Sequence, residues 1–199
     1  MSVTPRQELT IISDWIPKDS TVLDLGCGDG TLLAQLEKRG VRGYGLEIDE
    51  DNLAHCFRSG LNVIKQDIDE GLDNIGDQRF DFVLMTQALQ AVHRPDRVLS
   101  DMLRAGREAI VTFPNFGHWR VRAYLAMVGR MPVSENLPYH WYDTPNIHMC
   151  TVNDFERFCA ENNMKITERV IMNRRHKAGP LTRLLPNLFG QTAIYRVSR

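Results

Sequence analysis

The chain has 199 residues, of which 43% are hydrophobic and 25% are charged, a composition typical of a globular protein rather than a fibrous or wholly disordered one. Because 24 Lys and Arg residues stand against 25 Asp and Glu residues, the net charge of −1 provides no general attraction to nucleic acid or anionic lipid. No apolar run approaches the roughly 18 residues of a membrane span, and the first residues do not resemble a signal peptide. We expect a single cytoplasmic domain over residues 1–199.

Short apolar runs alternate with helical periodicity from residue 4 to about residue 113, which predicts a mostly parallel sheet covered by helices. The first predicted helix opens at Thr4 and Pro5 and ends before Pro17. The predicted strands cover residues 21–25, 43–47, 62–66, 80–85 and 109–113. Further helices are predicted at residues 31–39, 49–60 and 95–103.

Residues 114–150 interrupt this alternation, and we call them the insertion. They contain four prolines, three of the six histidines and two of the three tryptophans, with helical character only around residues 121–127. A long connection in a compact domain is usually functional or disordered, and the aromatic content argues against disorder. After the insertion, Thr151 and Asp154 predict a capping box, and residues 165–172 and 193–197 predict two closing strands. We expect a doubly wound α/β fold with a seven-stranded sheet and an insertion after strand five.

A glycine loop, Asp-Leu-Gly-Cys-Gly-Asp-Gly at residues 24–30, follows the first predicted strand. Glycine permits backbone conformations that are closed to other residues and lets a ligand approach the main chain. The dinucleotide fingerprint G-x-G-x-x-G does not fit, because Thr31 occupies its last glycine position. By itself such a loop can also be no more than a tight turn.

The spacing D-x-G-x-G-x-G resembles motif I of the class I S-adenosylmethionine-dependent methyltransferases, whose ligand carries an ammonium and a sulfonium group. Glu47 ends the second predicted strand, where a carboxylate can accept both ribose hydroxyls, and Asp67 follows the third, where the family uses an acid toward the adenine amino group. Each acid alone can be a solvated strand-end residue. Three at successive strand ends indicate a site for S-adenosylmethionine or S-adenosylhomocysteine. The site implied by this resemblance comprises Asp24, Gly26, Cys27, Gly28, Gly30, Glu47, Ile48, Asp67 and Ile68.

The insertion resembles a narrower family, that of the methionine biosynthesis protein MetW. The similarity lies in residues 113–120, 129–133, 137–148 and 187–190, and together with the glycine loop it covers nearly the whole chain. It implies a methyltransferase-like fold, a role in methionine synthesis and association with a homoserine O-acyltransferase of the MetX type. The alternative function is that of an autonomous small-molecule methyltransferase.

No residue is identified as catalytic. Residues 86–93, after the fourth predicted strand, include no evident general base. His93 could serve, since histidine titrates near neutrality, but a histidine just before Arg94 and Pro95 is more often a surface residue. Methyl transfer to a good nucleophile needs little beyond alignment, so catalysis stays open.

Other side chains suggest alternatives to this interpretation. His118, His140, His148 and Cys150 lack the spacing of a structural zinc motif, so we expect no metal site. A nucleophile pair of Cys150 with His148 would lack an orienting group. The basic residues 174–177 lack repeated stacking aromatics, which disfavours nucleic acid as a partner.

Aromatic residues of and beside the insertion can wall a substrate pocket, form a partner-binding surface or pack in the core; they are Phe113, Phe116, Trp119, Tyr139, Trp141 and Tyr142. Aromatic and arginine side chains dominate the energetics of protein interfaces. We therefore expect the insertion to be the main partner-binding element, with Trp119 and Trp141 as its principal residues. Residues 169–199, which hold seven Lys and Arg residues and no acid, are expected to be an auxiliary contact.

Overall fold

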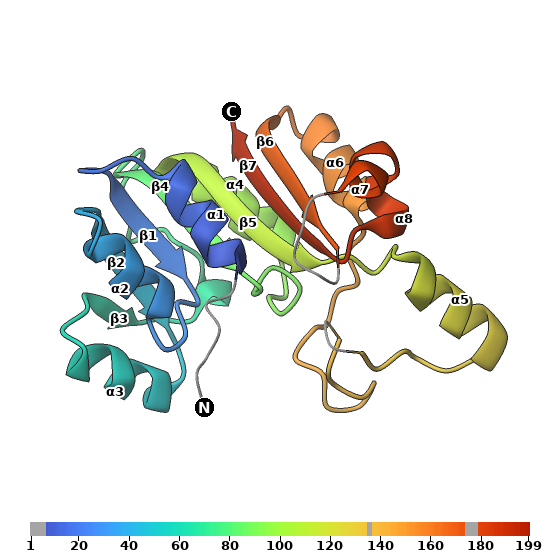
Figure 1. Ribbon diagram of the computed structural model, residues 1–199. Coiled ribbons are helices and arrows are strands. Elements are labelled where there is room, and N and C mark those ends of the chain that lie inside the picture. Colours follow the sequence, from blue (N-terminus) through green and yellow to red (C-terminus); the bar gives the residue numbers. More distant parts are fainter. Residues whose placement is uncertain (1–6, 135–136, 174–178) are drawn as a thin grey trace.

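The computed structural model describes residues 7–134, 137–173 and 179–199, which form a seven-stranded sheet with helices on both faces (Figure 1). Its strands are β1 (Thr21–Leu25), β2 (Arg42–Glu47), β3 (Val63–Lys65), β4 (Phe80–Thr86), β5 (Gly106–Pro114), β6 (Lys165–Met172) and β7 (Thr192–Ser198). The strand order is β3-β2-β1-β4-β5-β7-β6, and only the pairs formed by β7 are antiparallel. The predicted mostly parallel α/β fold is confirmed.

The helices are α1 (Gln7–Trp15), α2 (Thr31–Glu37), α3 (Glu50–Arg58), α4 (Pro95–Ala105), α5 (Trp119–Val128), α6 (Val152–Glu161), α7 (Pro180–Leu184) and α8 (Pro186–Phe189), with a 3-10 turn η1 (Ile68–Glu70). Asp49 caps α3 and Thr151 forms the predicted capping box with Asp154. The predicted helix start at Thr4 and Pro5 lies outside the described residues. The short elements η1, α7 and α8 were not predicted, because one turn carries no readable periodicity.

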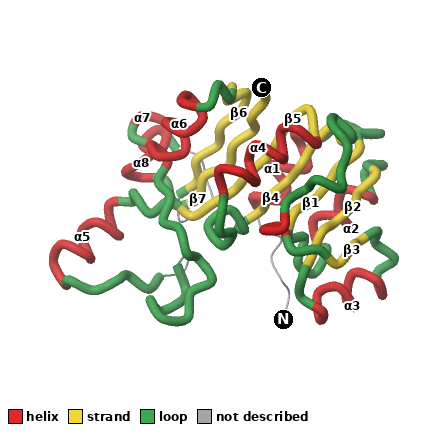
Figure 2. The backbone as a smooth tube through the Cα atoms, turned by 180° about the vertical axis from the view of Figure 1, so that it is seen from behind, coloured by secondary structure: helices red, strands yellow, loops and turns green. Residues whose placement is uncertain are grey.

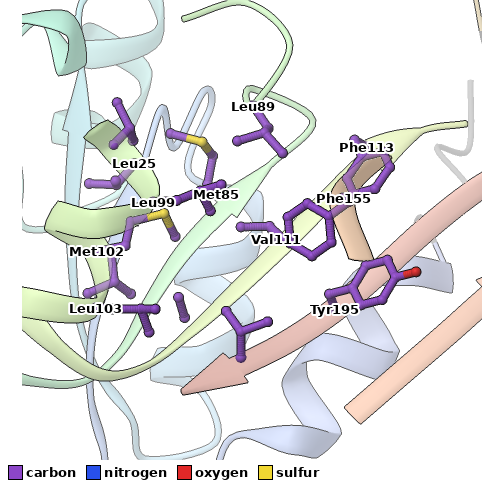
Figure 3. Packing of buried hydrophobic residues seen from close by; sticks show 14 of the residues in the cluster. Leu25, Met85, Leu89, Leu99, Met102, Leu103, Val111, Phe113, Phe155 and Tyr195 are labelled. Carbon is purple, nitrogen blue, oxygen red and sulfur yellow. The ribbon is translucent and has the colours of Figure 1, made fainter. Parts of the chain in front are cut away.

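The strands distribute their side chains between two hydrophobic layers, as the alternation of a strand requires. Val83 and Met85 of β4 pack with α4 and α6 on one face (Figure 3). Phe82 and Leu84, which alternate with these residues along β4, pack with α1 and α2 on the other face. Figure 2 shows the same sheet from behind, with helices before and beyond it. Because both faces are covered, the edge where β1, β2 and β4 end remains as the place for a ligand.

The insertion leaves and re-enters the fold at one clasp, centred on the buried Asn115. The Asn115 Oδ1 accepts hydrogen bonds from the backbone N–H groups of Gly117 and Val152, and its Nδ2 donates to the carbonyl oxygens of Asn187 and Gly190. The two ends of the insertion are therefore held together against the connection between β6 and β7.

Helix α5 extends from this clasp with little support from the sheet. Val121 is the only residue of α5 that is buried, and the helix projects away from the sheet in Figure 1. Helices in globular proteins are stabilised mainly by packing an apolar face. The apolar side chains of α5 other than Val121 are therefore left without a packing partner in the core.

Candidate cofactor site

The glycine loop is fastened to the neighbouring strand by its own backbone. The N–H groups of Gly26 and Cys27 both donate to the carbonyl oxygen of Leu46 in β2, at 2.9 and 3.1 Å. Gly26, Gly28 and Gly30 have φ angles of 68°, 56° and 76°, in the left-handed region that favours glycine. The predicted loop residues thus form one tight, fixed turn between β1 and α2.

Two of these glycines serve different purposes. A Cβ atom on Gly30 would lie 2.3 Å from Leu61 Cδ1 and 2.9 Å from Cys56 Sγ, so this glycine is needed for packing against α3 and the segment after it. A Cβ atom on Gly28 would meet no other atom within 4 Å. Gly28 therefore borders open space, as expected where a ligand approaches the main chain.

Asp24, near the end of β1, carries the most unusual carboxyl group of the site. It is only 1% exposed, and neither of its side-chain oxygens has a hydrogen-bond partner among the described residues. Burial, and then the nearby charge of Glu47, raise the pKa of Asp24 to about 8. Buried polar groups are almost always paired, so an unpaired carboxyl suits a ligand that brings its own donor. The ammonium group of an S-adenosyl ligand fits this requirement.

Glu47, at the end of β2, has its carboxylate already engaged by the backbone. The Oε2 atom accepts the Gly28 N–H at 2.7 Å, and Oε1 accepts the N–H groups of Ile48 and Asp49 at 2.8 and 2.9 Å. The sequence predicts a ribose-binding acid here but does not show this second task. Glu47 shapes the glycine loop, and a carboxylate keeps acceptor capacity beyond these three bonds.

The remaining predicted residues lie on the segments that border the loop. Asp67 caps η1 by accepting the Asp69 N–H at 2.9 Å. A Cβ atom on Gly26 would lie 3.6 Å from Ile68 Cδ1, so η1 stands directly beside the glycine loop. Ile48 is 55% exposed, although it follows the buried Glu47. Ile48 thus presents an uncovered apolar side chain of the kind that an adenine ring can contact.

His93 is held by an acid that sequence analysis did not single out. Asp69 Oδ1 accepts the His93 backbone N–H, and its Oδ2 accepts the ring Nδ1–H, both at 2.8 Å. The bond to Asp69 raises the pKa of the exposed His93 imidazole above its ordinary value. The expectation of a surface position for His93 is confirmed, but the residue is fixed rather than free. The separation of 24 positions between Asp69 and His93 in the chain hides this pair from sequence analysis.

The nucleophile pair of Cys150 with His148, which the sequence disfavours, does not form. Cys150 Sγ donates to the Thr151 carbonyl oxygen, whereas His148 Nε2 donates to the carbonyl oxygen of His93 at 3.2 Å. Burial raises the pKa of the Cys150 thiol to about 12, which keeps it protonated and unreactive.

Within residues 7–134, 137–173 and 179–199, no group of three His, Cys, Asp or Glu side chains is arranged to hold a metal ion. In the same ranges no helix is long and apolar enough to cross a bilayer.

The aromatic set divides between core and surface. Phe113 is fully buried between Phe155 and Tyr195, so the core interpretation is correct for this residue. Trp119 and Trp141 are 43% and 76% exposed, so the core interpretation is wrong for them.

Comparison with known proteins identifies the family. The family model of the methionine biosynthesis protein MetW matches residues 6–197. The chain belongs to the MetW family. A bifunctional methionine biosynthesis protein MetXA/MetW of Rhodopirellula baltica is 34% identical over 94% of the chain.

Other relatives match part of the chain. A ubiquinone biosynthesis O-methyltransferase of Methylococcus capsulatus is 31% identical over 61% of this MetW family chain. The alignments span 32% of the bifunctional Rhodopirellula protein and 54% of the Methylococcus enzyme. Both relatives are therefore considerably longer than the region they share with this chain.

Solved structures with the same fold include a [4+2]-cyclase, SpnF, and several S-adenosylmethionine-dependent methyltransferases. One from Archaeoglobus fulgidus superposes with a TM-score of 0.69 at 17% identity, covering 98% of this chain and 92% of its own. Magnesium protoporphyrin IX methyltransferase from Synechocystis, solved with bound S-adenosylhomocysteine, gives a TM-score of 0.68 at 18% identity and covers 98% of this chain and 83% of its own. At this identity the likeness establishes that the MetW family chain has the class I methyltransferase fold.

Proposed function

We propose that this chain binds S-adenosylmethionine or S-adenosylhomocysteine and acts in methionine biosynthesis together with a homoserine O-acyltransferase, as its regulatory or activating partner. The binding half of the proposal is carried by Asp24, a buried carboxyl without a hydrogen-bond partner among the described residues. It lies beside a glycine loop that is open at Gly28. An ammonium group at Asp24 would satisfy the orphaned oxygens with charge-assisted hydrogen bonds.

Within this proposal the residues of the site have separate tasks. Asp24 binds the ammonium group, and the backbone at Gly26 and Gly28 lets the amino-acid portion approach. Glu47 receives the ribose hydroxyls while holding the loop through the Gly28 N–H. Asp67 and the neighbouring apolar side chains border the adenine. A bound S-adenosyl ligand supplies an electrophilic methyl group or, once demethylated, only its binding energy.

Isothermal titration calorimetry with S-adenosylhomocysteine tests the binding half. Glu47→Ala should weaken affinity by about tenfold to a hundredfold, since hydrogen bonds to a charged group contribute roughly 1.5 to 3 kcal/mol. Glu50→Ala is a matched control, because Glu50 is an exposed acid at the start of α3 that pairs only with Lys65 among the described contacts. Absence of binding by the wild type, or an unchanged affinity in folded Glu47→Ala, would reject the site.

The partner half is supported by the bifunctional relative, in which MetXA and MetW occur in one chain. Most exposed large apolar side chains of the described residues belong to the insertion, among them Trp119, Met127, Tyr139, Trp141, Tyr142 and Ile147. Exposed apolar patches of this kind mark interaction sites. The guanidinium of Arg120 lies over the Trp119 ring, 5.4 Å from its centroid, so this part of the patch is also cationic. The insertion is thus the docking surface of the proposal.

The autonomous methyltransferase is the second candidate, favoured by the O-methyltransferase relatives and by the exposed imidazole of His93 beside η1. The two functions are separated by purifying the chain with the homoserine acyltransferase of its own organism. Complex formation with altered acyltransferase activity supports the regulatory role. Transfer of a labelled methyl group to a small molecule in the absence of the acyltransferase supports the enzyme instead.

A further inference from the structure

A continuous series of hydrogen bonds connects the segment that borders the candidate cofactor site to the insertion. It starts at Asp67, which accepts the Asp69 N–H. Asp69 in turn accepts two hydrogen bonds from His93, through the backbone N–H and the ring Nδ1–H. The carbonyl oxygen of His93 accepts the ring Nε2–H of His148, a residue of the insertion.

A second link runs parallel to the first and closes the connection. The carbonyl oxygen of Gln90 accepts the backbone N–H groups of Ile147 and His148 at 2.8 and 3.0 Å. The side chain of Gln90 is buried, and its Nε2 donates to the carbonyl oxygen of Pro114, where the insertion begins. The loop after β4 is therefore bonded to η1 on one side and to the insertion on the other.

We propose that Asp69, His93 and His148 couple the cofactor site to the insertion, so that ligand binding orders the docking surface. The proposal rests on the proposed function, because it needs a ligand at Asp67 and Ile68. A ligand that contacts these residues reduces the motion of η1, and Asp69 is part of the same turn. A segment ordered by one ligand costs less to order when a second one binds, which gives positive coupling without any change of shape.

The coupling is reciprocal by thermodynamic necessity. The factor by which S-adenosylhomocysteine tightens acyltransferase binding is therefore the factor by which the acyltransferase tightens S-adenosylhomocysteine binding. Coupling free energies between sites usually correspond to factors of about 5 to 150. Asp69, His93 and His148 act here as positioning residues. None of them has to touch the ligand or the partner.

The test is hydrogen exchange of the isolated chain with and without saturating S-adenosylhomocysteine, read at the amides of Ile147 and His148 that donate to Gln90. The ligand should slow their exchange severalfold in the wild type. Asp69→Ala should abolish the slowing, because Asp69 joins the loop after β4 to η1, and His148→Ala should reduce it, because the link through Gln90 remains. Arg157→Ala is the control, because Arg157 is an exposed residue of α6 that pairs with Glu161 and belongs neither to η1 nor to the insertion, and it should leave the slowing intact.

The outcomes separate this inference from the proposed function. Calorimetry first establishes that the wild type binds S-adenosylhomocysteine; no binding would reject both. Binding without any change in exchange at residues 147 and 148 would reject the coupling alone. An equal effect in wild type and His148→Ala would do the same. The factor by which the acyltransferase tightens S-adenosylhomocysteine binding should fall to about one in Asp69→Ala, fall in part in His148→Ala and stay at its wild-type value in Arg157→Ala.

Discussion

Asp24 and Glu47 stand near the ends of the adjacent parallel strands β1 and β2, yet their carboxyl groups are in opposite states. Glu47 accepts three backbone N–H groups, whereas neither oxygen of the buried Asp24 has a partner among the described residues. Glu47 builds the loop, and in the proposed function Asp24 is the acid that receives the ligand. Such unpaired burial is costly to the fold and is typical of a functional position.

Replacing Asp24 by Asn should stabilise the free protein while weakening ligand binding. The pKa of Asp24 is raised from 3.8 to about 8, so this carboxyl favours the folded state below pH 4 and loses that contribution as the pH rises toward 8. We expect the free energy of unfolding of Asp24→Asn to exceed that of the wild type by about 2 to 4 kcal/mol at pH 7. Below pH 4 the two free energies should be equal. Urea unfolding at both pH values measures this. A less stable Asp24→Asn at pH 7 would contradict it.

Binding of S-adenosylhomocysteine at pH 7 should release a proton. With its pKa at about 8, the Asp24 carboxyl is mostly protonated in the free protein, and an adjacent ammonium group favours its ionised form. The apparent binding enthalpy from calorimetry should therefore change with the ionisation enthalpy of the buffer. The slope of this dependence should correspond to the release of a sizeable fraction of one proton. Asp24→Asn should lose the dependence on buffer. Equal heats in all buffers for the wild type would show that Asp24 is not the ammonium ligand.

Gly28→Ala and Gly30→Ala should fail in different ways. Both positions have positive φ, which costs a residue with a Cβ roughly 1 to 2 kcal/mol. At Gly30 the Cβ atom would also collide with Leu61 and Cys56, so the melting temperature should fall markedly. At Gly28 it would enter open space, so Gly28→Ala should remain folded but lose ligand affinity. Thermal melts and calorimetry on the two variants compare these effects, and equal destabilisation would contradict the distinction.

Trp141→Ala should reduce acyltransferase binding without lowering the stability of the isolated chain. Its side chain is 76% exposed, so truncation leaves no cavity, while an aromatic residue that fills a partner pocket contributes about 2 kcal/mol or more. Phe113→Ala is the contrasting variant, since this buried ring should cost about 3 to 5 kcal/mol of stability. Co-purification and thermal melting give the two readouts. A wild-type level of complex in Trp141→Ala would remove this residue from the interface.

The fold, and the gathering of the candidate site residues at one edge of the sheet, could be predicted because both follow from local patterns. Each parallel strand is a short apolar run, and the acids at residues 24, 47 and 67 lie near the end of one, end one and follow one, respectively. Strands that run in one direction bring their carboxyl ends to one edge, so spacing along the chain becomes proximity in space.

What could not be predicted depends on contacts between distant segments. The bond from Asp69 to His93 and that from His148 to His93 join residues 24 and 55 positions apart, and no periodicity reports them. Glu47 appeared to be a ligand acid alone, because backbone N–H groups as its partners are invisible in a sequence. The exposure of Trp141 likewise follows from where the chain turns, and its aromatic character alone was equally compatible with a core position.

The clasp at Asn115 also affects how the family can change. The Phe116 N–H bonds to the Cys150 carbonyl oxygen at 3.0 Å, so the segment between them begins and ends at the same point. A loop whose ends already meet tolerates added or removed residues at small entropic cost. Evolution can lengthen, trim or replace this segment while the sheet and the glycine loop stay as they are. In the proposed function, the recognition of the partner is thus modular, and it can diversify at a rate different from that of the proposed cofactor site.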